Sequence, residues 1–324
     1  MKYAPVILFV YNRPDFAQQT LQSLTENALA NETELFIFAD GPKLNCTDKE
    51  LKKILSVREV IREKKWCGVV NIIESEFNKG LAKSVIDGVS EIISKFGKVI
   101  VVEDDVLLSP YFLTFMNDAL LTYQNNDKVF SIGSWNYFAD PGKIKDETFF
   151  FRFPDSIAWA TFARSWNLFE VNSEKLLNEL KSNGKLNNFN AGLKFPYFSN
   201  MLQAHIEGKI SSWAIRWTAI AVLKDKLTLF PTVSLSKHIG FSDDATHEKN
   251  VKDYNESILL CERKITVVSE KVEENSVALN EWKKFYLKNF IPKMTLNNFI
   301  RSVLKSVLPI RLIESYRKLR YKIK

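Results

Sequence analysis

The sequence predicts an α/β protein whose mostly parallel, Rossmann-like sheet is flanked by helices. Short apolar runs alternate with segments of helical periodicity through the first 130 residues, as in successive β-α units. The run 99–102 is β-branched without a break, which is typical of a strand buried on both faces of a parallel sheet. The chain has 324 residues, of which 46% are hydrophobic, so it is long enough to form a large core.

Local patterns place each element of this alternation. Thr47 and Glu50 stand three residues apart and form a capping box, which marks a helix start. Strands that are joined by helices require right-handed crossovers, and these make a sheet mostly parallel. In chain order we expect strand 6–10, helix 14–26, strand 35–39, helix 47–64, strand 69–73, helix 80–96, strand 99–102, a helix from Pro110 to Tyr123, and strand 129–135.

Composition excludes several classes of protein. Cys46, Cys67 and Cys261 are far apart and form no Cys-x-x-Cys pair, so the sequence predicts neither a zinc site nor a disulfide framework. A reducing cytosol fits this cysteine usage. The apolar run 6–10 is too short for a signal peptide, and no segment reaches the length of a membrane span. The chain also lacks a P-loop and a dinucleotide-binding glycine motif.

The basic charge is concentrated near the C-terminal end. Residues 301–324 carry eight basic residues and one acidic residue, so their net charge equals the +7 of the whole chain. Apolar residues lie between these charges, and Pro309 divides the segment into two short helices. The amphipathic tail 299–324 therefore predicts reversible attachment to a membrane surface, with docking on the protein's own core as the alternative.

Three consecutive acids, Glu103, Asp104 and Asp105, follow the strand 99–102. Ligands of open α/β sheets bind at the carboxyl ends of strands, where these side chains are expected. Mn²⁺ and Mg²⁺ prefer carboxylate oxygen, and they usually hold substrate phosphates with only one or two protein carboxylates. The motif therefore predicts a metal site for a phosphorylated substrate, and the alternative is a solvated acidic turn.

Other strand ends carry polar groups that suit a nucleotide. An Asn-Arg pair follows the first strand, and an Asp-Gly pair that permits a close backbone approach follows the second. An Asn-Lys-Gly segment precedes the helix 80–96 and is placed to direct backbone amides or its lysine at a substrate. Each segment also fits a plain turn or helix entry. The candidates are Asn12, Arg13, Asp40, Gly41, Asn78, Lys79 and Gly80.

Taken in order, these strand ends resemble those of glycosyltransferases of the GT-A fold, most of all the N-acetylglucosaminyltransferase I type and its bacterial polysaccharide relatives. The likeness is carried by segments 5–14, 39–41, 78–81 and 98–115 and by Ser134-Trp135-Asn136. It implies that Asp105 binds Mn²⁺ or Mg²⁺ and that Glu103 and Asp104 contact the donor beside it. It also implies a nucleotide-sugar-binding part over 1–130 and a mixed acceptor-binding part of the same domain over 131–260. The amphipathic pattern near the C-terminal end adds the expectation of a helical region over 261–324.

The second half is rich in tryptophan, and sugar rings stack on aromatic faces. Segment 157–162 resembles the Trp-Gly-Trp-Ala-Thr-Trp block of the bacterial relatives. Trp135, Trp159, Trp213 and Arg216 are the candidates for acceptor binding, while burial in the core is the ordinary alternative for a large apolar side chain.

The residue that would act as catalytic base stays open. Segment 209–217 resembles a block in which the relatives usually carry an Asp just upstream of the first Trp, and here that position is Ser211. An inverting transferase needs a base near the acceptor hydroxyl, and a serine of ordinary pKa cannot supply it. Asp155, Glu207 and Asp244 are alternative candidates.

Segment 238–247 resembles the relatives' Asn-Ile-Gly-Phe-Gly-Glu-Asp-Ala-Thr-His segment, with His238 in place of the Asn. The resemblance implies a loop that closes over the pyrophosphate. His247 would donate to a phosphate or complete the metal shell, and a structural turn with a surface histidine is the alternative.

Together these features predict a metal-dependent, inverting transferase of hexosyl or N-acetylhexosaminyl groups. It would move sugar from a nucleoside diphosphate sugar, in the first place a UDP-sugar, to a glycan or lipid-linked saccharide in surface polysaccharide biosynthesis. We expect it in the cytoplasm at the inner face of the plasma membrane, with no nucleic-acid partner. A sugar nucleotidyltransferase is one alternative, although segment 6–16 lacks the glycines of the N-terminal phosphate-binding loop expected in such an enzyme. A non-catalytic, membrane-associated glycan-binding relative is the other, favoured by Ser211 and opposed by the intact acidic motif.

Overall fold

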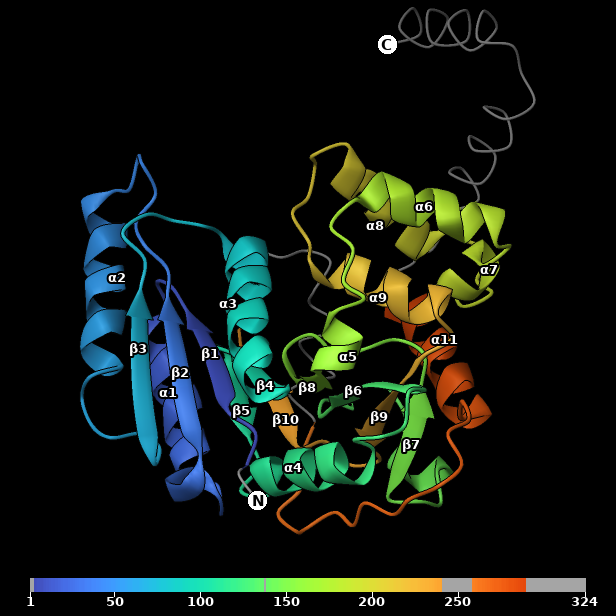
Figure 1. Cartoon of the computed structure of the whole chain (residues 1–324), viewed down its shortest axis with the longest axis horizontal. Coiled ribbons are helices and arrows are strands. Elements are labelled where there is room, and N and C mark those ends of the chain that lie inside the picture. The colour runs from blue at the N-terminus through green and yellow to red at the C-terminus, as the bar shows by residue number, and fades with distance from the viewer. Residues whose placement is uncertain (1–2, 137, 241–257, 290–324) are drawn as a thin grey trace, which may run out of the picture. The chain divides into compact units, whose positions relative to one another are not determined.

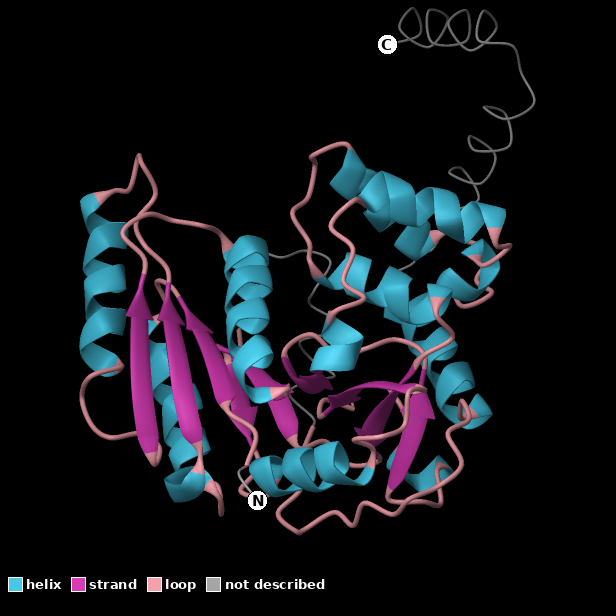
Figure 2. Ribbon diagram, in the orientation of Figure 1, coloured by secondary structure: helices cyan, strands magenta, loops and turns pink. Residues whose placement is uncertain are grey.

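A computed structural model of the chain describes residues 3–136, 138–240 and 258–289, and one large sheet runs through it (Figures 1 and 2). The described strands of this sheet lie in the order β3-β2-β1-β4-β8-β6-β9-β7. They are β1 (Val6–Val10), β2 (Glu34–Ala39), β3 (Val69–Glu74), β4 (Lys98–Glu103), β6 (Val129–Gly133), β7 (Thr148–Phe151), β8 (Ala158–Phe162) and β9 (Leu227–Pro231). A separate antiparallel pair joins β5 (Val106–Leu108) to β10 (Ser236–His238).

The first four strands confirm the predicted parallel arrangement. β3, β2, β1 and β4 are parallel neighbours, so their carboxyl ends meet at one edge of the sheet. β8 runs antiparallel between β4 and β6, and β7 runs antiparallel to β9. The sheet is therefore mixed but mostly parallel.

Helices cover both faces of this sheet, and β1 shows how its sequence divides between them. Val6, Leu8 and Val10 join the core cluster that includes the apolar residues of α1. Phe9 points to the other face, where a Cβ at Gly88 of α3 would lie 3.0 Å from its ring. The described helices are α1 (Pro14–Thr25), α2 (Asp48–Val60), α3 (Leu81–Phe96), α4 (Phe112–Thr122), α5 (Ala163–Trp166), α6 (Ser173–Ser182), α7 (Leu186–Phe189), α8 (Tyr197–Ile206), α9 (Ala214–Leu223) and α11 (Ser276–Asn289).

Local capping sets the start of α2 where the sequence predicts it. The Thr47 hydroxyl accepts from the Glu50 amide, and the Glu50 carboxylate accepts from the Thr47 amide, so the capping box is complete. The helix ends at Val60, four residues before the predicted end at Lys64. The other elements of the first half begin and end within about three residues of the predicted positions, as is usual for helix ends.

In the second half, α6, α7, α8 and α9 gather at one side of the sheet (Figure 1). Beneath them, tryptophan rings pack against one another: Trp159 lies 5.2 Å from Trp213 and 5.9 Å from Trp166 and Trp217, between ring centroids. These side chains form a second core between the sheet and the helices.

The chain up to Phe285 forms one compact unit. Residues 261–275 contain no helix, contrary to the expectation of a helical region from residue 261, and α11 follows them. The amphipathic tail 299–324 lies outside the described residues, so its membrane attachment stays a prediction. Within the part of the chain that the structure describes, no helix has the length and apolar character needed to cross a bilayer.

Candidate functional site

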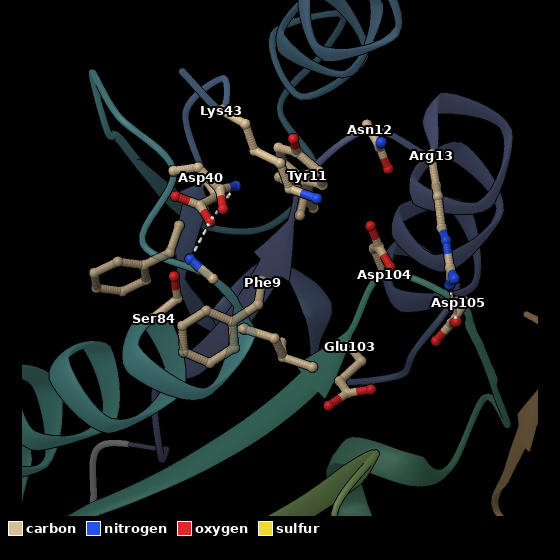
Figure 3. Close-up of a pocket in the computed structure, with 15 residues that line it drawn as sticks. Phe9, Tyr11, Asn12, Arg13, Asp40, Lys43, Ser84, Glu103, Asp104 and Asp105 are labelled. Atoms are coloured by element: carbon tan, nitrogen blue, oxygen red, sulfur yellow. Dashed lines mark hydrogen bonds and ion pairs between the residues drawn. The ribbon is translucent and has the colours of Figure 1, made fainter. Parts of the chain in front are cut away.

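The carboxyl ends of β1, β2 and β4 and the start of α3 surround a cavity of about 320 Å³ (Figure 3). Asp40 and Lys43 lie at one end of it, and Arg13 and Asp105 lie at the other. The parallel strand order brings these residues together, because each follows the end of a neighbouring strand. Of the predicted nucleotide-binding residues, the cavity is lined by Asn12, Arg13, Asp40, Asn78, Gly80, Glu103 and Asp104.

The Asp40 carboxylate joins the β2 end to the start of α3. Its Oδ1 accepts from the backbone amides of Gly41 (2.9 Å) and Lys79 (2.8 Å). Its Oδ2 accepts from the Gly80 amide (2.9 Å) and from Asn78 Nδ2 (3.0 Å). A carboxylate offers about four acceptor sites, so these bonds leave little capacity for a ribose hydroxyl. Asp40 therefore fixes the segment after β2 against segment 78–80, which leads into α3.

Gly41 is required by a close approach of two backbone segments. A Cβ at this position would lie 2.6 Å from the amide nitrogen of Phe77 and 2.7 Å from the carbonyl carbon of Glu76. Any larger residue would push the Phe77 segment away from the β2 end. The close approach that the sequence suggested for Gly41 is thus made by the protein's own chain.

Asp105 lies at the opposite end of the cavity and is almost completely buried. Its Oδ2 accepts from Arg13 Nη1 at 2.5 Å and lies 3.2 Å from His238 Nε2. Burial alone would raise the pKa of Asp105, but the hydrogen bond and charge of His238 and the charge of Arg13 outweigh it, so the pKa is lowered. Its Oδ1 is buried and has no hydrogen-bond partner among the described residues.

The pairing of β10 with β5 brings His238 to this acid. His238 stands opposite Val106 in the register, and the Ile239 amide donates to the Asp105 carbonyl at 2.8 Å. The next residue, Gly240, packs against the carboxylate so closely that a Cβ there would fall 1.9 Å from Oδ2. A segment more than 130 positions along the chain thus closes one side of the acidic motif.

The two preceding acids are held in an environment that favours their neutral forms. Burial and the negative charges of Asp105 and Asp104 raise the pKa of Glu103 well above its ordinary value. Burial and the charge of Asp105 likewise raise the pKa of Asp104 to about 7. The charge of Arg13 opposes both rises without cancelling them. The raised pKa values mean that the three acids are not all ionised together, and a bound cation would favour their ionised forms.

This arrangement fits a divalent ion that is held jointly with a substrate. The buried, unpartnered Oδ1 of Asp105 supplies one hard oxygen ligand. Within residues 3–136, 138–240 and 258–289, no cluster of three or more His, Cys, Asp and Glu side chains could hold a metal ion alone. An ion at Asp105 would thus depend on phosphate and water for most of its ligands, as Mg²⁺ commonly does.

The three candidates for the base have different places. Asp155 is buried, and its carboxylate accepts from the backbone amides of Ser134, Trp135, Ser156 and Ile157. Burial raises its pKa, and those amides oppose the rise. Glu207 is exposed at the end of α8, where it pairs with Lys209, and it does not line the cavity. Asp244 lies outside the described residues, as does the metal candidate His247.

The acceptor-binding candidates divide into core and surface positions. Trp159 has 0% of its surface exposed and Trp213 has 3%, so both rings are core residues in this structure. Trp135 is half-buried, with its ring centroid 5.9 Å from that of His238. Arg216 and Lys79 line a second cavity beside α3.

The structure adds residues that the sequence did not single out. Phe9, Tyr11, Lys43 and Ser84 also line the cavity. Tyr11 and Lys43 lie within two residues of predicted positions, so widening each strand-end segment would have included them. The sequence indicated less about His238, because the segment that 238–247 resembles carries Asn at this position.

No protein-family profile matches the chain, and no curated protein matches it in sequence. Among solved structures, S. aureus TarS 1–349 is 17% identical with a TM-score of 0.39, over 78% of this chain and 63% of that one. A UDP-glucose pyrophosphorylase complexed with UDP-glucose is 13% identical with a TM-score of 0.38, over 78% and 96%. The mannosyltransferase PcManGT from Pyrobaculum calidifontis, in complex with GDP-Man and Mn²⁺, is 12% identical with a TM-score of 0.32, over 68% and 74%. Likenesses this distant do not assign a function.

Proposed function

We propose that the chain is a divalent-metal-dependent glycosyltransferase that takes its sugar from a nucleoside diphosphate sugar, with a UDP-sugar as the favoured donor. The observation that carries the proposal is the cavity at the ends of the parallel strands, with three successive acids and a buried, unpartnered Asp105 oxygen. Sugar nucleotides combine a diphosphate with a base and ribose, and the cavity offers an acid and a base at each end, Asp40 with Lys43 and Asp105 with Arg13. The resemblance of the strand ends to GT-A glycosyltransferases supports the same reading.

In this proposal Asp105 holds Mn²⁺ or Mg²⁺, and His247 is a further candidate ligand. When bound, the ion neutralises charge that develops on the diphosphate leaving group. Arg13 supplies guanidinium donors beside Asp105, and Gly80 and Leu81 at the start of α3 line the cavity. Asp40 keeps that helix start in place through its four hydrogen bonds. Asp155, Glu207 and Asp244 stay alternatives for the base.

We further propose that transfer is inverting, that the acceptor is a glycan or lipid-linked saccharide of a surface polysaccharide, and that the tail 299–324 attaches the enzyme to the inner face of the plasma membrane. The charge and apolar residues of the tail support the attachment.

The test is release of nucleotide from UDP-, GDP- and dTDP-sugars by the purified chain in Mn²⁺, in Mg²⁺ and in EDTA. We expect slow release of one nucleoside diphosphate that EDTA abolishes. D105N should lose this activity and D146N should keep it, because Asp146 is exposed and its side chain has no hydrogen bond or ion pair among the described residues. Binding of no sugar nucleotide under any condition would refute the proposal. Release of pyrophosphate from a nucleoside triphosphate and a sugar phosphate would instead identify a nucleotidyltransferase.

A further inference from the structure

A second cavity, of about 390 Å³, lies on the other side of the start of α3. Gly80 lines both cavities, so the two sites meet at the first turn of one helix. Lys79, Lys83 and Asp87 line the second cavity from the α3 side. Ser211 and Arg216 line it from the segment that leads into α9 and from α9 itself.

Arg216 is an unusual group for a cavity wall, because it is charged and only 6% exposed. Its Nε donates to the Ser212 carbonyl and its Nη1 to the Val171 carbonyl, both at 3.3 Å. A guanidinium has five N–H donors, so these two long bonds leave most of them unused. Among the residues that the structure describes, no carboxylate pairs with Arg216. Buried charges are normally paired, and this one opens onto a cavity without its counter-ion.

The electrostatic effects of Arg216 agree with an uncompensated charge. Burial lowers the pKa of Arg216 itself. Burial and the positive charge of Arg216 lower the pKa of the neighbouring His205. An acid beside the guanidinium would cancel both effects in large part.

The rest of the cavity wall adds positive potential. The Lys79 ammonium is exposed and has no ion pair within the described part of the chain. Lys83 is paired with Asp87 at 2.9 Å, the one acid of the wall. No side chain caps the start of α3, and its N-cap residue Gly80 lines this cavity as well as the first, so the positive end of the helix dipole lies beside both. Three cations and a helix N-terminus thus stand against one carboxylate.

We propose that this second cavity binds a phosphate group carried by the acceptor. The inference rests on the proposed function, because only a transferase has an acceptor. A planar guanidinium binds phosphate oxygens in pairs, and a helix N-terminus adds backbone donors. The Ser211 hydroxyl is a further donor on the wall. A carboxylate at position 211 would compete for Arg216, whereas serine leaves the guanidinium available to a ligand.

The test measures inorganic phosphate binding to the full chain by calorimetry at low ionic strength, without nucleotide and with saturating UDP. We expect phosphate to bind in both cases with affinities within about twofold. R216Q should weaken phosphate binding at least tenfold, and D87N should strengthen it severalfold. D118N is the matched control, because Asp118 is also a partly exposed acid paired with a lysine, Lys264, yet does not line the cavity. Its phosphate affinity should equal that of the wild type.

Because D87N gains affinity, its result does not depend on whether R216Q folds. Absence of phosphate binding, or equal affinity in the wild type, R216Q and D87N, would overturn the proposal. Competition between UDP and phosphate would also overturn it, because the anion site would then belong to the donor diphosphate. If phosphate binds as expected but no sugar nucleotide does, the anion site stands and the transferase assignment fails, so the two failures are distinguishable.

Discussion

The Asp40 carboxylate offers the sharpest test of how the nucleotide cavity is built. Asp40→Asn replaces one acceptor oxygen by an amide nitrogen, and in either orientation two of the four donors around the side chain lose their acceptor. A hydrogen bond to a charged group contributes about 1.5–3 kcal/mol. Water reaches the partly buried Asn78 and Gly80 and offsets part of the loss. We therefore expect D40N to lower the free energy of unfolding by about 2–4 kcal/mol.

For a compact unit of this size, about 1 kcal/mol shifts the melting temperature by about 2 °C, so D40N should melt about 4–8 °C lower. Either orientation of the new amide releases one backbone amide at the start of α3, that of Lys79 or that of Gly80, so UDP affinity should fall as well. Thermal unfolding by circular dichroism and UDP titration by calorimetry measure the two effects. D146N is the control and should change the free energy of unfolding by less than about 0.5 kcal/mol. A D40N protein with wild-type melting temperature and UDP affinity would refute the conclusion that the Asp40 hydrogen bonds hold the start of α3 in place.

Four further outcomes are expected. Trp159→Ala should cost about 3–5 kcal/mol in urea unfolding, because its ring is a core residue, whereas a ring used only for acceptor stacking would leave stability unchanged. Gly41→Ala should lower both melting temperature and UDP affinity, since its Cβ would strike the Phe77 backbone. Mn²⁺ should raise the melting temperature of the wild type but not of D105N, measured with and without EDTA. Burial raises the pKa of Cys67 to about 12, so the folded protein keeps a thiol proton that the unfolded chain releases near pH 9. Iodoacetamide at pH 8 should therefore modify the half-buried Cys46 in the folded protein and Cys67 only after unfolding. Mass spectrometry of the modified peptides measures both reactions.

The first half of the fold could be predicted from the sequence because its signals are local. Strand 99–102 is a β-branched run, and α2 begins at a capping box, so each boundary is determined by residues within a few positions of it. Strand ends that are neighbours in a parallel sheet must share an edge. The place of Asn12, Asp40 and the acidic motif around one cavity followed from that rule alone.

The rest of the site depends on contacts between distant segments, which no local pattern contains. His238 reaches Asp105 only because β10 pairs with β5, across more than 130 positions. A tryptophan in the sequence is compatible with either core or stacking, and only the packing of Trp159 against Trp213 decides between them. Arg216 was a candidate for acceptor binding, but the absence of a carboxylate beside it in the described structure could not be read from its position.

The start of α3 connects these observations, because one helix turn serves both cavities. Asp40 binds the Lys79 and Gly80 amides, Gly80 lines both cavities, and the Lys79 side chain lies on the second. If this turn positions groups of both cavities, a substitution that loosens it at the first cavity should also lower ligand affinity at the second. D40N should therefore weaken phosphate binding at the Arg216 cavity as well as UDP binding, although Asp40 does not line that cavity. If D40N lost UDP affinity and kept wild-type phosphate affinity, the two cavities would be independent sites that happen to share a wall.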